Sequence, residues 1–497
     1  MFKKILIANR GEIAVRIIRA CKELGITSAA IYSDADSHSL HTLLADESYY
    51  IGESSVSSSY LNKEKIINLA REIKADAIHP GYGFFSENAD FIKAVEDSGI
   101  TFIGPSSESV RMMGSKTGAR QLMQKNNVPI VPGTTEPVKN NDEALKFCKE
   151  IGYPVLLKAS AGGGGKGMRK VSSEDEFKDA FDAAKREAMN AFGNDDIYIE
   201  KYIEQPRHIE VQVIADKHGN YAHLFERECS IQRRHQKIIE EAPSPFVDDI
   251  TRDNITSAAI KAAKACNYYN AGTIEFLMDK DKNFYFLEMN TRLQVEHPVT
   301  EMITSIDLVN EQISIAAGNK LSFKQVDLRI IGHAIESRIY AEQPENNFLP
   351  STGKLIEYIE PSGPGVRVDS GSVTGYDISL YYDPLISKLI CYGKTREAAI
   401  SIMKRALKEF HIAGVITNIF FLSEIFNQKD FYEGNYDINY IEKKGLISNS
   451  SSEQLTEMEC VAALLASILK NESGINGKIH NSGNHIHTNK WLEQNYE

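Results

Sequence analysis

Residues 4–103 alternate short apolar runs with segments in which apolar residues recur at helical spacing. The first run, residues 4–9 (KILIAN), is typical of a buried strand, and residues 12–24 follow with Ile13, Ile17 and Leu24 on one helical face. Further strands are expected at residues 28–32, 77–79 and 101–103, with helices at 65–74 and 91–97. This alternation predicts an open parallel sheet, and thus an α/β fold for the start of the chain.

The turn after the first strand bears on one obvious function of such a sheet, dinucleotide binding. Residues 9–14 (NRGEIA) contain one glycine, whereas the GxGxxG fingerprint requires three. Those glycines let the backbone approach the pyrophosphate of the nucleotide. The sequence therefore disfavours NAD binding.

Length and charge limit the remaining possibilities. A chain of 497 residues is too long for one typical core, so roughly two to four domains are expected. The net charge of −12 argues against a nucleic-acid or membrane partner, because binding phosphates or anionic lipids needs a basic surface. The six cysteines include no CxxC pair, and no apolar run is long enough for a membrane span or a signal sequence. We therefore expect a cytoplasmic protein.

Changes of pattern along the chain predict three folded segments and a tail. We expect an N-terminal domain at residues 1–113, a middle domain at 114–330, a C-terminal domain at 331–446 and a tail at 447–497. The C-terminal segment is rich in strands, such as residues 333–342 (HAIESRIYAE). In the tail, a serine-rich linker precedes an amphipathic helix around residues 455–468, and the three histidines beyond it are expected in a flexible segment rather than at a metal site. The fold class is α/β combined with α+β.

A glycine-rich stretch at residues 158–168 (KASAGGGGKGM) is the strongest local signal. Its consecutive glycines let backbone N–H groups approach a polyphosphate, while Lys158 and Lys166 can neutralise the charge. It is not a Walker loop, because positions 160 and 167 hold serine and glycine instead of the required glycine and Ser/Thr. Lys158 is expected to end an apolar strand at 154–157, and Lys116 is a second candidate phosphate contact. The alternative is a flexible surface loop.

Two apolar strands that carry carboxylates are expected at residues 272–278 (GTIEFLM) and 284–290 (FYFLEMN). If Asp279 pairs with Phe284, Glu275 lies directly opposite Glu288 on one face of the hairpin, and Asn290 lies beside Glu288. Opposed carboxylates repel each other unless a divalent cation binds between them, and oxygen ligands favour Mg²⁺ over Zn²⁺. The alternative is that both carboxylates are solvated on the open face of a surface hairpin.

Polar residues directly after this hairpin add a candidate anion site. In residues 291–298 (TRLQVEHP), Arg292 and Gln294 can bind an anion, and Glu296 is a potential general base. Upstream, residues 226–237 (ERECSIQRRHQK) concentrate three arginines and Lys237 in an otherwise acidic chain. A nucleic-acid patch is the alternative for that cluster, but it has no interleaved aromatic residues and the net charge opposes it.

These motifs together resemble those of a known family. The chain is similar to biotin carboxylases of the ATP-grasp superfamily over about residues 1–445, on five matching stretches at 8–26 (ANRGEIAVRIIRACKELGI), 79–91 (HPGYGFFSENADF), 158–168, 226–237 and 288–301 (EMNTRLQVEHPVTE). The family usually has leucine after GYGF, where this chain has Phe85. That exchange is apolar for apolar and affects no catalytic position.

The resemblance implies a Rossmann-like N-terminal domain, an ATP-grasp domain whose glycine loop lies on a mobile lid at about 131–203, and a strand-rich C-terminal domain. It implies that ATP phosphates are bound by Lys116, Lys158 and His208, and that Glu200, Lys201 and Ile203 form the adenine pocket. The further residues implied in ATP binding are Gly163, Gly164, Gly165, Lys166, Gln232, His235, Glu275 and Glu288. Two Mg²⁺ ions are expected, with Glu275, Glu288 and Asn290 as ligands and Mn²⁺ as a possible substitute.

The resemblance also implies the chemistry. Lys237, Arg292, Gln294 and the backbone of Val295 are expected to bind bicarbonate, and Glu296 to deprotonate it. The resulting oxyanion attacks the γ-phosphate of ATP to give carboxyphosphate. The remaining expectation concerns biotin: Arg338 stabilises its enolate, and Tyr82 lies beside it.

Partners follow from the same resemblance. The sequence contains no Ala-Met-Lys-Met biotinylation motif, and its Met403-Lys404 pair is expected inside a helix, so we expect the biotin carrier protein and the carboxyltransferase on separate chains. A homodimer is expected, in an acyl-CoA carboxylase or a two-chain pyruvate carboxylase. The rival functions are a carbamoyl-phosphate-type ATP-grasp ligase and a catalytically silent nucleotide-binding subunit. Retention of Lys158, Lys237 and Glu296, among other charged positions, argues against a silent subunit.

Overall fold

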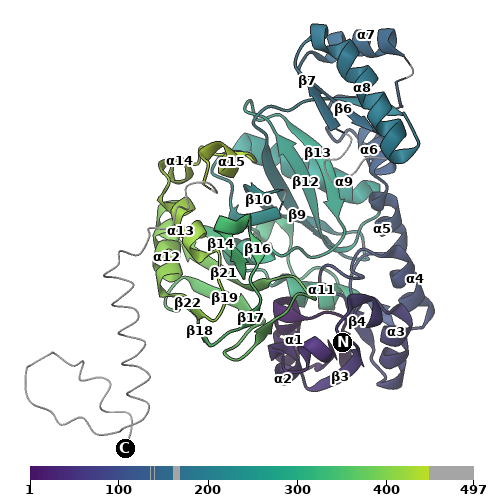
Figure 1. The fold of residues 1–497 in the computed structure, drawn as a ribbon. Coiled ribbons are helices and arrows are strands. Elements are labelled where there is room, and N and C mark those ends of the chain that lie inside the picture. Colours follow the sequence, from purple (N-terminus) through teal and green to yellow (C-terminus); the bar gives the residue numbers. More distant parts are fainter. Residues whose placement is uncertain (135, 139, 160–167, 235, 447–497) are drawn as a thin grey trace, which may run out of the picture. The chain divides into compact units, whose positions relative to one another are not determined.

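The computed structural model describes residues 1–134, 136–138, 140–159, 168–234 and 236–446 (Figure 1). The tail helix expected near 455–468, the glycines at 162–165 and Lys166 lie outside the described residues. Among the helices of the described residues, none is long and apolar enough to cross a bilayer.

The N-terminal segment forms the parallel sheet that the sequence predicts. Its five strands lie in the order β3-β2-β1-β4-β5, and every neighbouring pair is parallel. The strands are β1 (Lys4–Ile7), β2 (Thr27–Ser33), β3 (Glu47–Gly52), β4 (Ala77–His79) and β5 (Thr101–Phe102). The helices of residues 1–125 are α1 (Gly11–Glu23), α2 (Leu40–Leu44), α3 (Lys63–Glu72), α4 (Ala89–Asp97), α5 (Ser107–Gly114) and, at the start of the middle segment, α6 (Lys116–Lys125). Strand β3, at the edge, is the one that the apolar pattern does not predict.

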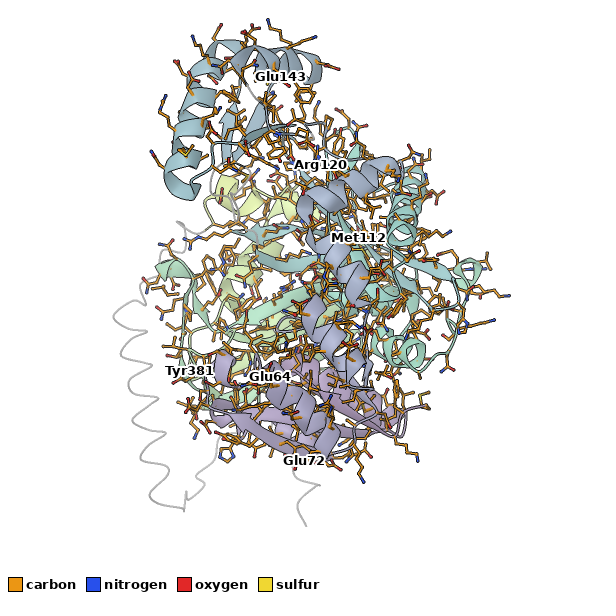
Figure 2. The ribbon with its side chains drawn as sticks, turned by 90° about the vertical axis from the view of Figure 1, so that its right-hand side faces the viewer. Glu64, Glu72, Met112, Arg120, Glu143 and Tyr381 are labelled. Atoms are coloured by element: carbon orange, nitrogen blue, oxygen red, sulfur yellow. The ribbon has the colours of Figure 1, made fainter. Side chains whose placement is uncertain are left out.

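Polar side chains fix where these helices begin. Asn62 accepts a hydrogen bond from the backbone of Lys65 at the start of α3, and Asn88 caps α4 in the same way. Helices α5 and α6 then lead away from the parallel sheet, as Met112 and Arg120 show in Figure 2. Lys116 is the first residue of α6, although its side chain is not among those described.

A small antiparallel sheet with the order β7-β6-β8 occupies most of the segment expected as a lid. It consists of β6 (Val155–Ala159), β7 (Met168–Val171) and β8 (Ile197–Lys201), together with α7 (Asn141–Ile151) and α8 (Glu174–Phe192). The expectation that Lys158 ends the apolar strand is wrong, because the strand continues to Ala159, which pairs with Ile197. Lys158 is therefore held within a sheet rather than at the end of a strand.

An eight-stranded sheet joins the middle and C-terminal segments, in the order β13-β12-β9-β10-β11-β14-β21-β19. Its strands are β9 (Arg207–Ala215), β10 (Tyr221–Arg233), β11 (Gln236–Ala242), β12 (Asn270–Met278), β13 (Phe284–Asn290), β14 (His333–Tyr340), β19 (Val366–Ser370) and β21 (Leu385–Gly393). The two segments meet where β11 pairs with β14, for example at Ile239 and Ser337. One continuous sheet therefore carries residues from both segments.

Helices and short strands complete this part of the chain. The helices are α9 (Asp249–Ala265), α10 (His297–Thr304), α11 (Leu308–Ala316), α12 (Arg396–Glu409), α13 (Ile419–Asn427), α14 (Lys429–Tyr432) and α15 (Tyr440–Lys444). The short strands are β15 (Glu342–Gln343), β16 (Leu349–Pro350), β17 (Gly353–Lys354), β18 (Glu357–Ile359), β20 (Asp377–Ile378) and β22 (His411–Ala413). Met403 and Lys404 lie inside α12, as expected.

The register of the large sheet aligns charged side chains in one row. Arg227 on β10 pairs with Glu210 on β9, which pairs with Glu275 on β12, which pairs with Glu288 on β13. The predicted opposition of Glu275 and Glu288 is confirmed, but its premise is wrong: Met278, not Asp279, pairs with Phe284. A β-bulge between Glu275 and Phe276 restores the pairing, because one extra residue of β13 shifts the register.

Strand β14 shows how the fold separates core from site. Ile335 and Ile339 point into the hydrophobic core beneath α12, which also contains Met403. Glu336 and Arg338 alternate with them and therefore project from the opposite face. Apolar packing on one face thus fixes the position of the charged residues on the other.

We predict that Glu241→Gln lowers the free energy of unfolding by about 3–5 kcal/mol near neutral pH, because it breaks a buried ionic cluster. Glu241 on β11 accepts hydrogen bonds from His333 (2.6 Å), Arg396 (2.6 and 2.9 Å) and Tyr436. Burial would raise the pKa of Glu241, but His333 and Arg396 lower it from 4.5 to about 2. This stabilisation is therefore present above pH 4.5 and is lost as the pH falls towards 2.

Urea unfolding of wild type and variant across that pH range measures the difference. The control is Glu409→Gln, which removes an exposed ion pair with Arg405 and should change stability by less than about 0.5 kcal/mol. If the unfolding free energies of wild type and Glu241→Gln differ by the same amount at low pH, the ionised Glu241 is not the source of this stabilisation.

Candidate active site

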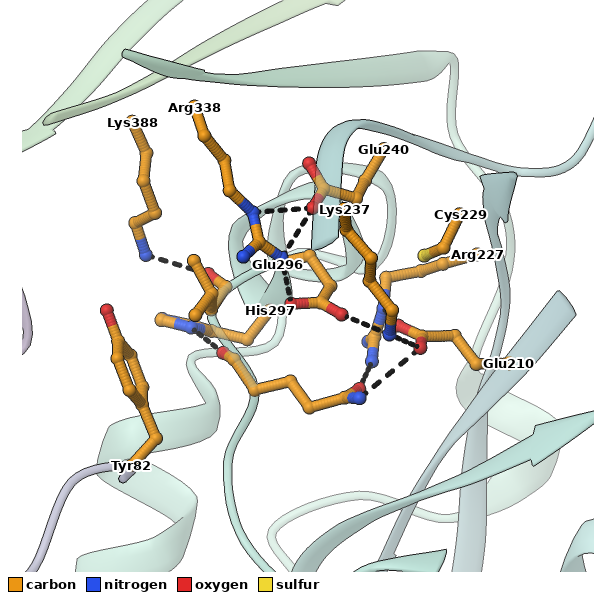
Figure 3. A network of polar contacts seen from close by, with 12 residues as sticks. Tyr82, Glu210, Arg227, Cys229, Lys237, Glu240, Glu296, His297, Arg338 and Lys388 are labelled. Atoms are coloured by element: carbon orange, nitrogen blue, oxygen red, sulfur yellow. Dashed lines mark hydrogen bonds and ion pairs between the residues drawn. The ribbon is translucent and has the colours of Figure 1, made fainter. Parts of the chain in front are cut away.

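The ammonium group of Lys237 lies at the centre of a buried cluster of carboxylates (Figure 3). Its Nζ donates to Glu210 (2.5 Å), Glu275 (2.8 Å) and Glu296 (2.7 Å). Burial would lower the pKa of Lys237, but these three carboxylates raise it well above its usual value. The lysine therefore remains charged and holds three negative groups together.

Glu296 lies directly before α10 and has a cation on each oxygen. Oε1 accepts from Lys237, and Oε2 accepts from Nη2 of Arg338 at 2.9 Å. Burial would raise the pKa of Glu296, but Lys237 and Arg338 lower it overall. The side chain is therefore an ionised carboxylate that can accept a proton.

Arg338 approaches Glu296 from β14 and also donates to Glu240 on β11 through Nε at 2.7 Å. Nearby, the hydroxyl of Tyr82 donates to Glu12, and Lys388 lies 3.2 Å from the same Glu12 oxygen. Lys388 further donates to the carbonyl oxygen of Val295 at 2.8 Å. These contacts connect the N-terminal segment to the loop before α10.

That loop carries three of the residues expected to bind bicarbonate, Arg292, Gln294 and Val295, and the side chains of the first two have further contacts. Arg292 donates to Glu87 at 2.8 Å and to Oδ1 of Asn290 at 2.9 Å. Gln294 donates to Glu275 at 2.8 Å. Both side chains thus lie beside residues expected to bind the metal.

One pocket of about 520 Å³ brings several of the expected residues together. Its lining includes Tyr82 and Arg338, expected beside biotin, as well as Arg292 and Val295, expected to bind bicarbonate. Tyr381, labelled in Figure 2, also lines it. The walls therefore come from the N-terminal, middle and C-terminal segments.

The residues expected to bind ATP fall into separate groups. His208 joins the Lys237 cluster, with Nε2 3.2 Å from Glu275. Lys158 on β6 and Arg120 on α6 both pair with Glu200 on β8. Arg120 lies well away from Tyr381 in Figure 2. Two further residues expected to bind ATP donate to nearby backbone carbonyl groups. Lys201 donates to those of Gly152 and Tyr153 (3.0 Å each), and Gln232 donates to that of Cys229 (2.7 Å). Ile203 is half-buried.

Gly163, Gly164, Gly165, Lys166 and His235 lie outside the described residues. Of the expected metal ligands, Glu275 and Asn290 are buried and Glu288 is exposed, so the alternative in which both carboxylates are solvated is wrong for Glu275. Among the described residues, His208, Glu210 and Glu275 also lie close enough together to hold an ion.

Sequence reasoning did not assign Arg227 and Glu210, although both are completely buried in this site. Arg227 donates to Glu210 (2.6 Å), Gln212 (2.8 Å), Thr300 (2.9 Å), Thr273 (3.2 Å) and Gln294 (2.5 Å). The available signal was a glutamate inside the apolar run at 209–214 and an arginine in the motif at 226–229. Glu87, which pairs with Arg292, and Lys388 were also not assigned.

Three family models match consecutive parts of the chain. The biotin carboxylase N-terminal domain matches residues 1–110, the ATP-binding domain of the carbamoyl-phosphate synthase L chain matches 115–324, and the biotin carboxylase C-terminal domain matches 336–443. Biotin carboxylase 1 of Bacillus subtilis is 52% identical over 443 residues, which are 89% of this chain and 98% of that protein. The chain belongs to the biotin carboxylase family.

Other relatives of this chain are also parts of biotin-dependent carboxylases. One of the pyruvate carboxylase subunits of Methanothermobacter thermautotrophicus is 50% identical over 94% of this chain and 96% of its own. The biotin carboxylase domain dimer of Hydrogenobacter thermophilus 2-oxoglutarate carboxylase, solved with MgADP, ADP and bicarbonate, is 50% identical, with a TM-score of 0.82 over 91% of this chain and 100% of that one. The chain is an ATP-dependent carboxylase ligase.

We predict that Arg227→Lys lowers bicarbonate-dependent ATP hydrolysis by at least about tenfold. A lysine cannot reproduce the planar fork that holds Glu210, Gln294 and three neutral side chains in place. Steady-state kinetics with varied bicarbonate measure the loss.

Arg252→Lys is the matched control, because Arg252 clamps buried Glu226 (2.9 Å) outside this cluster. It should lower thermal stability but leave turnover within about twofold. Equal loss of turnover in both variants would assign Arg227 to general stability alone.

Proposed function

We propose that this chain carboxylates biotin held on a carrier protein, using ATP and bicarbonate and passing through carboxyphosphate. The observation that carries the proposal is the pocket in which Arg292 and Val295 meet Tyr82 and Arg338, beside the Lys237–Glu296 pair. Residues for two different substrates line one space, as expected if one product is passed directly to the second substrate.

The first step is the activation of bicarbonate. Lys237, Arg292, Gln294 and the backbone N–H of Val295 bind the anion, and Glu296 accepts its proton. The bicarbonate oxygen then attacks the γ-phosphorus of ATP, ADP leaves, and carboxyphosphate forms. Cations at this position are needed because two anions must come into contact, and their repulsion would otherwise oppose the reaction.

The second step transfers carbon to biotin. Carboxyphosphate breaks down to CO₂ and phosphate, and the phosphate takes the proton from N1 of the biotin ureido group. Arg338 stabilises the enolate oxygen that results, and the enolate nitrogen attacks CO₂. Exclusion of water from the pocket protects the intermediate from hydrolysis.

The residues present also suit a divalent cation. Glu275 and Glu288 oppose each other across the hairpin and Asn290 lies two residues beyond Glu288, which gives an oxygen-donor set of the kind that Mg²⁺ prefers. A bound divalent cation screens the negative charge of the ATP phosphates. Lys116, Lys158, His208, Gln232 and His235, with the glycines and Lys166 of the 158–168 loop, would bind those phosphates and the nucleotide, while Glu200, Lys201 and Ile203 contact adenine.

We further propose that the segments 1–113, 114–330 and 331–446 are the domains of this chain. The chain works as a homodimer, together with a biotin carrier and a carboxyltransferase on other chains. The 497 residues contain no Ala-Met-Lys-Met motif, and Met403 is buried inside a helix. The relatives include subunits of carboxylases for different acceptors, among them propionyl-CoA carboxylase of Sus scrofa and the pyruvate carboxylase subunit. We propose that this chain is the biotin carboxylase subunit of an acyl-CoA carboxylase, and a two-chain pyruvate carboxylase is the alternative.

Turnover of the purified chain tests the reaction itself. ATP hydrolysis should require bicarbonate, and free biotin should be carboxylated slowly, with a biotinylated carrier as a much better substrate. Dependence on an amine instead of biotin would identify a carbamoyl-phosphate-type ligase. Absence of turnover in the intact chain would favour the silent subunit.

We predict that Glu275→Gln or Glu288→Gln raises the Mg²⁺ concentration needed for half-maximal ATP hydrolysis and largely abolishes turnover, because each removes one ligand charge. Titration of Mg²⁺ binding by calorimetry, in the presence of a non-hydrolysable ATP analogue, gives a readout separate from activity. Asp281→Asn, in the turn of the same hairpin, is the control and should bind Mg²⁺ normally. Unchanged Mg²⁺ dependence in both site variants would refute the pairing.

We predict that Arg338→Ala lowers biotin carboxylation by about 10²–10³-fold, the usual cost of losing a group that stabilises a developing anion. Bicarbonate-dependent ATP hydrolysis without biotin should fall much less, because Arg338 acts on biotin. The two rates are measured on the same preparation. A parallel fall of both would place Arg338 in the bicarbonate site instead.

A further inference from the structure

Two buried carboxyl groups, Glu240 and Glu336, lie behind the proposed biotin site without a role in the reaction. They pair directly across strands β11 and β14, so their side chains project from the same face of the sheet. Cβ atoms of such opposed residues are roughly 4.5–5.5 Å apart. Both side chains are 0% exposed.

The two carboxyl groups differ in their hydrogen bonds. Glu240 accepts from Arg338 at 2.7 Å through Oε1, whereas its Oε2 accepts no hydrogen bond from the described residues. Neither oxygen of Glu336 has a hydrogen-bond partner within the described part of the chain. A buried carboxylate without donors is strongly unfavourable, so Glu336 is expected to be a neutral carboxylic acid.

Charged groups on the surrounding elements support this protonation state. Those that face the pair are Arg338 on β14, Lys388 on β21, Lys237 on β11, Glu296 before α10 and Tyr82 from the N-terminal segment, and α10, which packs on β14, begins with His297. Burial raises the pKa of Glu336 well above its usual value; Lys388 opposes this and Glu240 adds to it. Burial likewise raises the pKa of Glu240 to about 7 despite its contact with Arg338.

The proposed reaction creates a difficulty at this position. Arg338 lines the pocket, but its guanidinium group donates to Glu240 and Glu296 (Figure 3), so a hydrogen bond to the biotin enolate would take part of its contact away from Glu240. Glu240 would then be a buried carboxylate that has lost the cation hydrogen-bonded to it, although Lys237 still lies nearby, and that loss opposes the movement of Arg338. A neutral acid directly opposite can replace the lost partner by donating its O–H to the carboxylate.

We infer that Glu336 carries a proton and donates it in a hydrogen bond to Glu240 when Arg338 turns to the ureido oxygen of biotin. The inference rests on the proposed function of Arg338. The proton stays within the Glu240–Glu336 pair, and no bond is broken or formed in the substrates. Glu336 is thus a positioning residue, because its hydrogen bond to Glu240 lowers the free energy needed to move Arg338 towards biotin.

Two substitutions of one residue separate this role from simple packing. Glu336→Leu has a similar volume but no donor, and it should lower the ratio of biotin carboxylation to bicarbonate-dependent ATP hydrolysis by about tenfold. Glu336→Gln retains an N–H donor and should restore most of that ratio. Glu241→Gln, a buried carboxylate on the opposite face of β11, is the control: it should lower stability but leave the ratio unchanged.

The pH dependence gives a second readout. As the pH rises and the pair loses its proton, wild type should lose biotin carboxylation faster than ATP hydrolysis, because two carboxylates then hold Arg338. Glu336→Gln lacks the carboxyl proton of residue 336 but keeps an N–H donor, so its ratio should fall less steeply than that of wild type over the same range. An infrared difference spectrum of wild type minus Glu336→Gln should also contain the carbonyl band of a protonated carboxyl at neutral pH.

The outcomes are distinct. Absence of that infrared band, or a wild-type ratio in Glu336→Leu, overturns the inference. Equal loss of the ratio in the Leu and Gln variants also overturns it, because a donor then fails to rescue. A wild-type chain that does not carboxylate biotin refutes the proposed function instead, whatever the infrared result.

Discussion

The organisation of the site depends on one buried ammonium group. Lys237 forms ion pairs with Glu210, Glu275 and Glu296, which come from two strands and from the loop before α10. Without it, three carboxylates would repel one another in a region with little access to water, and their burial would be unfavourable. The same interaction therefore stabilises the sheet and holds the expected base beside the expected metal ligand.

Sheet register supplies the geometry that this interaction requires. Residues of β10, β9, β12 and β13 form a single row, from Arg227 through Glu210 and Glu275 to Glu288. Glu288 joins this row opposite Glu275 only because the bulge in β13 shifts the register by one residue. A bulge at such a place is a feature of the site and not an irregularity of the fold.

The parallel sheet could be predicted because its central strands are continuously apolar and its helices have clear periodicity. Strand β3 was missed because it lies at the edge and alternates exposed and half-buried residues, such as Tyr50. The pairing of Ile239 with Ser337 could not be predicted from pattern, because it joins strands far apart in the sequence. Phe85, where this chain departs from the family motif, stacks on the buried ring of Phe91, with the two ring centroids 4.4 Å apart.

Motif resemblance named most of the site but could not supply its contacts. Arg227 and Glu210 escaped notice because a charged residue in an apolar strand has no local signature that distinguishes a buried partner from a solvated side chain. Their roles follow from the register and from five hydrogen bonds made by Arg227 to residues spread between positions 210 and 300. Such a set of contacts is a property of the folded chain.

Lys237 and Arg338 both contact Glu296 and are both expected to contact a substrate as well, and this double use affects the basicity of Glu296. While Lys237 and Arg338 both contact it, its pKa is held low and it is a weak base. Bicarbonate and biotin are expected to draw these two cations towards themselves, and each contact that Glu296 loses raises its affinity for a proton. On the proposed mechanism, the base would therefore be strongest when the substrates are in place, which would couple proton transfer to substrate binding and limit unproductive cleavage of ATP.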